Sequence, residues 1–150
     1  MGKRRKGKPT PGALVRDTGK AVRTEEVTDS MQQCPSWQVG TVDLDGPFDW
    51  RRITSDEALQ VQARLSCLET MTWTEILVEG NRRNHFIQTN RLAPLARKRL
   101  SDIGQDDIDH VMSLAVKGKA RILGILSNAV LRVLWWDPEH QACPSPLRRT

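Results

Sequence analysis

The apolar residues in the last third of the chain form three short runs with few polar residues between them. The runs are HVMSLAV, ARILGIL and AVLRVLWWD, and the segments KGK and SN separate them. Each run is rich in Val, Ile and Leu and has the length of a β-strand. Because connections this short join neighbouring antiparallel strands, the pattern predicts a three-stranded antiparallel meander.

Before the meander, the hydrophobic pattern predicts a strand and then a helix. Alternation in the sequence SWQVGTV, which the turn sequence DGP follows, predicts a strand over residues 37–42. Thr54 or Ser55 can cap a helix of about residues 55–69. Glu57 follows Thr54 by three residues and completes a capping box, which strengthens this assignment.

Two more helices are predicted before the meander begins. A brief one starts at Thr72 or Thr74. The second main helix covers about residues 92–103, because Pro94 is tolerated only in a first turn and Gly104 suits the position after a helix. The order of strand, helices and meander predicts an α+β domain with both main helices on one face of an antiparallel sheet.

The last two apolar runs contain two arginines whose positions depend on the turn between them. If the dipeptide SN forms a two-residue turn, Arg121 faces Leu134 and Arg132 faces Leu123. The two arginines then lie on one face of the sheet, separated along it. They either bind phosphate there or cover the exposed face with their aliphatic stems.

Trp135 and Trp136 are adjacent in the last run and therefore point to opposite faces of the predicted strand. One is expected in the core between helices and sheet, and the other on the open face. An exposed tryptophan beside arginines stacks on a nucleic-acid base or is covered by a partner protein.

Charge is distributed unevenly along the 150 residues. Residues 1–29 hold eight Lys/Arg and four Asp/Glu, a net +4 out of +5 for the whole chain. We expect residues 1–34 to form a disordered basic tail, 35–145 a single domain and 146–150 a short C-terminal tail. The basic tail either attracts nucleic acid without reading its sequence or only keeps the protein soluble.

Composition argues against several classes of protein. No apolar stretch is long enough to cross a membrane, and the basic start MGKRRKGKPTPG lacks the apolar region of a signal peptide. The three cysteines, Cys34, Cys67 and Cys143, lie far apart and form no CxxC pair. We therefore expect a cytoplasmic protein with reduced cysteines, no disulfide framework and no zinc site.

The order of elements, the hairpin sequence GKARILGI and the strand end VLWWDPEH together resemble the RelE/ParE superfamily of bacterial toxins. The resemblance covers roughly residues 37–143. The closing run is also similar to the ends of uncharacterised bacterial proteins with a WWDPxH-type sequence. The superfamily implies a first strand, two helices and a three-stranded meander that bears a basic functional face.

The resemblance implies a metal-independent endoribonuclease that cleaves mRNA, in some members at the ribosome, and that uses no cofactor. An arginine on the middle meander strand of such enzymes stabilises the phosphate, and Arg121 matches it by position. His140 lies where a C-terminal Tyr or His assists proton transfer, and this chain has no tyrosine. Lys98 and Arg99 correspond to basic residues on the second helix.

The residues themselves suit this chemistry. A histidine can exchange protons near neutral pH, and RNA cleavage without metal needs such a group together with a positive charge at the phosphate. Asp137 and Pro138 form a turn that would hold His140 just beyond the sheet. Asp137 either orients the His140 ring or only caps the turn.

Further basic and aromatic residues are candidates for binding nucleic acid. The complete set predicted to contact RNA consists of Arg82, Arg83, Lys98, Arg99, Lys117, Lys119, Arg132 and Trp136. His85 belongs to the same basic loop as Arg82 and Arg83. The spacing of the three histidines matches no known metal site, so no metal is predicted.

Two functions remain open from the sequence. In the first, the protein is a toxin whose partners are RNA or the ribosome and a small antitoxin-like protein. In the second, it is a non-catalytic module that binds nucleic acid or a protein with the same basic face. Neither function involves a membrane.

Overall fold

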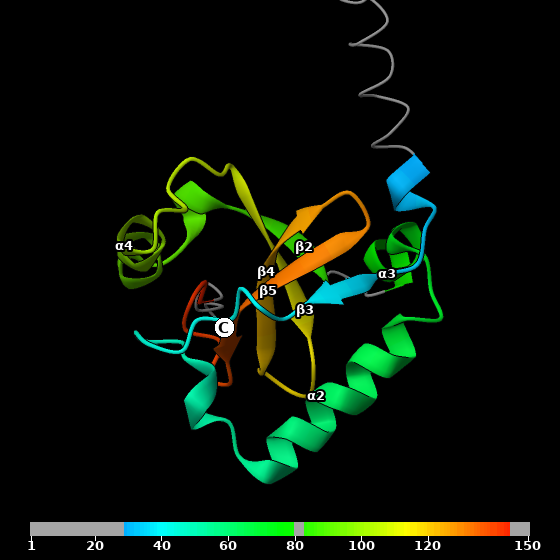
Figure 1. Ribbon diagram of the computed structural model, residues 1–150, viewed down its shortest axis with the longest axis horizontal. Coiled ribbons are helices and arrows are strands. Elements are labelled where there is room, and N and C mark those ends of the chain that lie inside the picture. Colours follow the sequence, from blue (N-terminus) through cyan, green and yellow to red (C-terminus); the bar gives the residue numbers. More distant parts are fainter. Residues whose placement is uncertain (1–28, 80–82, 145–150) are drawn as a thin grey trace, which may run out of the picture.

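The computed structural model describes residues 29–79 and 83–144, which form an α+β fold around a five-stranded mixed sheet (Figure 1). The strands are β1 (Ser36–Gln38), β2 (His85–Gln88), β3 (His110–Ala115), β4 (Arg121–Ser127) and β5 (Val130–Asp137). Their order in the sheet is β1-β5-β4-β3-β2. Only β1 runs parallel to its neighbour; the other pairs are antiparallel.

The α+β class is confirmed, but the sheet is larger than predicted. β3, β4 and β5 are consecutive antiparallel neighbours, and β2 adds a fifth strand on the outer side of β3. The prediction that the four residues of β2 belong to a loop is wrong; it followed from the polar, basic stretch before them. The first strand is also shorter than predicted and ends at Gln38.

The helices begin and end near the predicted residues. They are α2 (Ser55–Leu68), α3 (Trp73–Glu79) and α4 (Pro94–Asp102), with 3-10 turns at Trp50–Arg52 and Thr89–Arg91. The predicted capping box is confirmed: Glu57 N–H donates to the Thr54 hydroxyl at 3.2 Å, and Thr54 N–H donates to the Glu57 carboxylate at 3.0 Å.

A glycine ends α4 as predicted. Gly104 has a φ of +72°, and its N–H donates to Ser101 O at 3.0 Å. Gln105 N–H donates to Leu100 O at 2.8 Å, which completes a Schellman motif. This motif fixes the position of Gln105 immediately after the helix.

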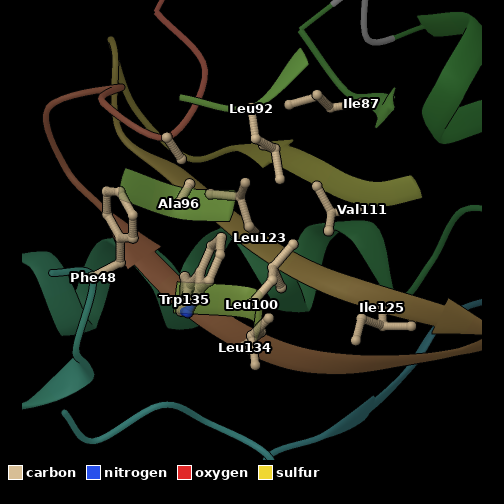
Figure 2. Packing of buried hydrophobic residues seen from close by; sticks show 11 residues of the cluster. Phe48, Ile87, Leu92, Ala96, Leu100, Val111, Leu123, Ile125, Leu134 and Trp135 are labelled. Carbon is tan, nitrogen blue, oxygen red and sulfur yellow. The ribbon is translucent and has the colours of Figure 1, made fainter. Parts of the chain in front are cut away.

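The two main helices lie on opposite faces of the sheet, so the prediction that they share one face is wrong (Figure 1). Ala96 and Leu100 of α4 pack on Leu123 and Trp135, as Figure 2 shows. α2 and α3 pack on the other face against residues such as Ile122. The inner strands are nearly continuous apolar runs because both of their faces are buried.

Burial of both faces also overturns the prediction that one tryptophan of β5 is exposed. Trp135 is fully buried beside Phe48, with ring centroids 5.1 Å apart. Trp136 is 1% exposed and packs beside Trp50 on the other face, at 5.6 Å. In the part of the chain that the structure describes, both faces of β5 are covered, so neither ring can stack on a base.

The predicted pairing of β4 with β5 is wrong because the turn lies one residue later. Ser127 pairs with Val130, and Asn128 occupies the turn with a φ of +55°. A bulge then inserts one extra residue in β5: Leu123 faces Trp135, whereas the next residue, Gly124, faces Val133. As a result, Arg121 faces Asp137 and Arg132 faces Ile125.

The segment of residues 41–50 covers the outer edge of β5 beyond the three residues of β1. The Thr41 hydroxyl donates to Val133 O at 2.9 Å, and Asp43 N–H donates to Leu134 O at 2.8 Å. Trp136 N–H in turn donates to Phe48 O at 3.1 Å. These bonds provide hydrogen-bond partners for backbone N–H and C=O groups on the outer edge of β5 that do not pair with β1.

No helix within residues 29–79 and 83–144 is long and apolar enough to cross a membrane. The predicted basic tail, apart from its last residues, and the predicted tail of residues 146–150 lie outside the described residues. The basic residue Arg82 also lies outside them.

Candidate functional site

One end of the sheet, on the α4 face, brings together three catalytic candidates and two further basic residues. We call the group of Arg83, His85, Arg121, Asp137 and His140 the Arg121 site. Its residues come from β2 and the segment before it, from the start of β4, and from the end of β5 and the turn that follows. Arg121 and Asp137 are direct neighbours across β4 and β5.

Arg121 is held over the turn between β3 and β4. One terminal nitrogen, Nη1, donates to Gly118 O at 2.7 Å and to Ala120 O at 2.9 Å. The Nε–H group is buried and finds no hydrogen-bond partner in the part of the chain that the structure describes. Burial, and then the charge of Arg83, lower the pKa of Arg121, so an anion at this site would be favourable.

Asp137 fixes the turn that carries His140. Its carboxylate is buried and accepts the backbone N–H groups of Gln141 at 2.9 Å and Ala142 at 2.8 Å. It forms no hydrogen bond with the His140 ring. Of the two roles that the sequence left open, the structure therefore supports capping, and Asp137 positions His140 through the backbone.

The surroundings of His140 favour the neutral form of its imidazole. Burial, the positive charge of Arg121 and the nearby His85 lower the pKa of His140 below 6.5, and Asp137 only partly opposes them. The residue also has a φ of +57°, a conformation that the capped turn maintains. A neutral imidazole next to a guanidinium can accept a proton from a substrate that the guanidinium binds.

Arg83 was predicted to bind RNA from a basic loop that also contains His85, and neither residue was predicted to join a catalytic group. His85 instead starts β2 and pairs with Ser113 of β3, which brings it close enough to His140 to influence its pKa. Arg83 donates from Nη2 to Gly118 O at 3.1 Å, the same carbonyl that Arg121 contacts. Recognising β2 as a strand would have revealed this arrangement.

The two lysines of the turn between β3 and β4 form the rim of the site. Lys117 and Lys119 are exposed. Lys119 Nζ lies 2.5 Å from the Glu139 carboxylate, one residue before His140. This exposed ion pair links the two loops that border Arg121.

The remaining predicted contacts lie elsewhere. Arg99 forms two hydrogen bonds of 2.8 Å with Asp43, so it stabilises the fold and is not free to bind phosphate. Trp136 is buried and cannot stack on a base.

Arg132 shares a face with Arg121 but lies four strand residues away, about 13 Å along the sheet. Lys98 is exposed on α4, and its role stays a prediction.

The third histidine is separate from the Arg121 site. His110 starts β3 at the other end of the sheet and packs edge-on against Phe86, with ring centroids 6.1 Å apart. Within the described ranges, no group of three or more His, Cys, Asp or Glu residues is arranged to hold a metal ion.

Comparisons of the chain with protein-family models, curated proteins and solved structures find no match.

Proposed function

We propose that the protein is a RelE-like, metal-independent endoribonuclease that cleaves mRNA at the Arg121 site. The observation that carries the proposal is the position of His140: Asp137, the neighbour of Arg121 across β4 and β5, holds the His140 turn, and Arg121 Nε–H finds no hydrogen-bond partner in the described part of the chain. The succession of β3, β4 and β5 after the main helices supports the proposed likeness to RelE/ParE toxins.

The proposed reaction is an attack of the ribose 2′-hydroxyl on the adjacent phosphorus. His140 accepts the 2′-hydroxyl proton, and the 2′-oxygen forms a bond to phosphorus. Arg121 stabilises the added negative charge of the phosphorane, which exists only in the transition state. The bond to the 5′-oxygen breaks, His85 donates a proton to that oxygen, and the products carry a 2′,3′-cyclic phosphate and a 5′-hydroxyl.

The other residues of the site would position these groups. Asp137 holds the turn of His140 through Gln141 and Ala142, and Arg83 adds positive charge next to Arg121. Lys117 and Lys119 on the rim suit the flanking phosphates of an RNA strand. RNA or the ribosome in a bacterial cytoplasm, and a small antitoxin-like protein, are the corresponding partners.

One observation favours the alternative, a non-catalytic module that binds nucleic acid or protein at the same site. Asp137 bonds the backbone and not the His140 ring, so no hydrogen-bonded carboxylate orients the imidazole. A docking site needs only the positive charges of Arg83, Arg121 and the rim lysines. It does not need an imidazole that is oriented as a general base.

The test is cleavage of purified RNA and of ribosome-bound mRNA in the presence of EDTA, with detection of 2′,3′-cyclic phosphate ends. We expect the wild-type protein to cleave, and His140→Gln to be slower by about 10²–10⁴-fold. His110→Gln is the matched control, because it removes a histidine from the other end of the sheet. Binding of RNA without cleavage of either substrate would leave the binding module as the function.

A further inference from the structure

A second site lies at the other end of the same sheet face, between the end of α4 and the start of β5. It is a cavity of about 260 Å³, slightly below the roughly 300–1,000 Å³ of sites for drug-sized ligands. Its walls are mainly apolar and include Val42, Ile103, Ile125 and Leu134. Figure 2 shows Ile125 and Leu134 beside the α4-side core.

Two polar residues of this cavity are already fully engaged. The Asp43 carboxylate accepts two hydrogen bonds of 2.8 Å from Arg99 and one of 3.0 Å from the Trp135 indole. The Thr41 hydroxyl donates to Val133 O at 2.9 Å. Neither residue therefore requires a ligand, and the charge of Asp43 is neutralised by Arg99.

Arg132 and Gln105 have no such partners. The Nε–H group of Arg132 is buried without a hydrogen bond, and its guanidinium forms no ion pair with any residue in 29–79 or 83–144. The Gln105 side chain has no hydrogen-bond partner among those residues either, although the Schellman motif fixes its backbone. A partly buried guanidinium without a counter-ion is unfavourable, so this cavity favours an anion.

We propose that this cavity binds a small carboxylic acid with a short apolar chain. A carboxylate matches the planar, two-pronged guanidinium of Arg132, and the Gln105 amide offers a further donor. The apolar chain would lie against Val42, Ile103, Ile125 and Leu134. A single carboxylate charge balances Arg132, which among the described residues is the one cation lining this cavity, whereas a phosphate dianion would leave a second charge against apolar walls.

This site is independent of the proposed ribonuclease activity. About 13 Å of sheet separates Arg132 from Arg121, and Leu123 and Trp135 of the core fill the space between them. The acid would therefore bind whether or not the Arg121 site cleaves RNA.

The experiment is a titration of the full-length, isotope-labelled protein with hexanoate, followed by NMR. We expect saturable shifts of the backbone amides of Ile103, Gln105, Ile125 and Arg132. Hexanamide has the same chain without the charge and should bind about tenfold more weakly or worse. Equal shifts from hexanoate and hexanamide, or no saturable shift at these residues, would overturn the proposal.

Variants test whether Arg132 supplies the charge. Arg132→Gln should weaken hexanoate binding about tenfold or more, and Gln105→Ala should weaken it less. Gln105→Ala removes the amide of a partly exposed side chain that lies outside the main core, so it tests the site even if Arg132→Gln does not fold. Arg97→Gln, an exposed arginine of α4 outside this cavity, is the control for lost charge. Unchanged hexanoate affinity in Arg132→Gln would contradict the assignment.

Discussion

Gly124 lies directly against the backbone of Arg132: a Cβ added to this glycine would be 2.5 Å from the Arg132 carbonyl oxygen. The contact occurs at the bulge that shifts the pairing of β4 with β5 by one residue. Without that extra residue, Asp137 would point to the face of α2 and Trp136 to the face of α4. The bulge therefore places Asp137 on the same face as Arg121.

The first prediction concerns this contact. Gly124→Ala should destabilise the protein by about 1–3 kcal/mol, because the added methyl group meets backbone that cannot move without disturbing the sheet. Urea unfolding would measure the loss. Gly40→Ala is a matched control, since a Cβ there meets nothing within 4 Å. Equal stability of the two variants would show that β4 and β5 can separate at the bulge.

The second prediction concerns the adjacent tryptophans. Trp135→Ala and Trp136→Ala should each lower the free energy of unfolding by about 3–5 kcal/mol, because each ring is completely buried on its own face of the sheet. Thermal or chemical denaturation would compare them. A small effect of either change would mean that one face of the sheet is open after all.

The third prediction is a pH dependence that originates in His140. Because the pKa of His140 is below 6.5, its protonation favours the unfolded chain. The stability that depends on neutral His140 should be fully present above pH 6.5. It should be lost as the pH falls through the pKa of His140 in the folded protein. NMR titration of the imidazole resonances would measure that pKa directly.

Arg121 supplies part of this shift, so Arg121→Gln should raise the pKa of His140 toward 6.5. The resonances of His110, at the other end of the sheet, serve as an internal control and should not respond. An unchanged His140 titration in Arg121→Gln would show that the two side chains do not interact.

The fourth prediction concerns Asp43 and Arg99. The hydrogen bonds from Arg99, the Asp45 backbone and Trp135 overcome burial and lower the pKa of Asp43 below 3.8. The stabilisation that ionised Asp43 provides should therefore be fully present above pH 3.8. It should disappear as the pH falls through the pKa of Asp43 in the folded protein. Arg99→Met should destabilise the protein by about 2–4 kcal/mol, since it leaves Asp43 buried without its cation.

A double-mutant cycle would check this pairing. Asp43→Asn combined with Arg99→Met should be less destabilised than the sum of the two single changes, because the second change removes no further ion pair. Additive losses would show that the 2.8 Å contacts contribute little to stability.

Local signals in the sequence predicted the helix ends well. The Thr54 capping box and Gly104 after α4 depend on residues three or fewer positions away from the helix end, so the sequence contains what determines them. The side of the sheet on which each helix packs depends on contacts between distant residues. The run ILGIL at residues 122–126 of β4 has no alternating polar residues, which is typical of a strand that is buried on both faces.

The candidate site could be predicted only in part, because some of its residues come together through contacts between distant segments of the chain. Arg121, Asp137 and His140 lie together because β4 and β5 are consecutive, and their order along the chain already indicated it. His85 joins them through β2, a four-residue strand that pairs with the edge of β3. No local pattern distinguishes such a strand from a polar loop.

The segment of residues 41–50 has a consequence for association between copies of the chain. β5 has eight residues, but β1 pairs with only three of them. Hydrogen bonds from Thr41 and Asp43, and one to Phe48, occupy the backbone groups that remain on this edge. If this segment detached, β5 would present a long apolar edge rich in Val, Leu and Trp, which is the kind of template on which chains aggregate by strand addition. The segment of residues 41–50 therefore covers an edge of β5 to which a strand of another chain could otherwise add.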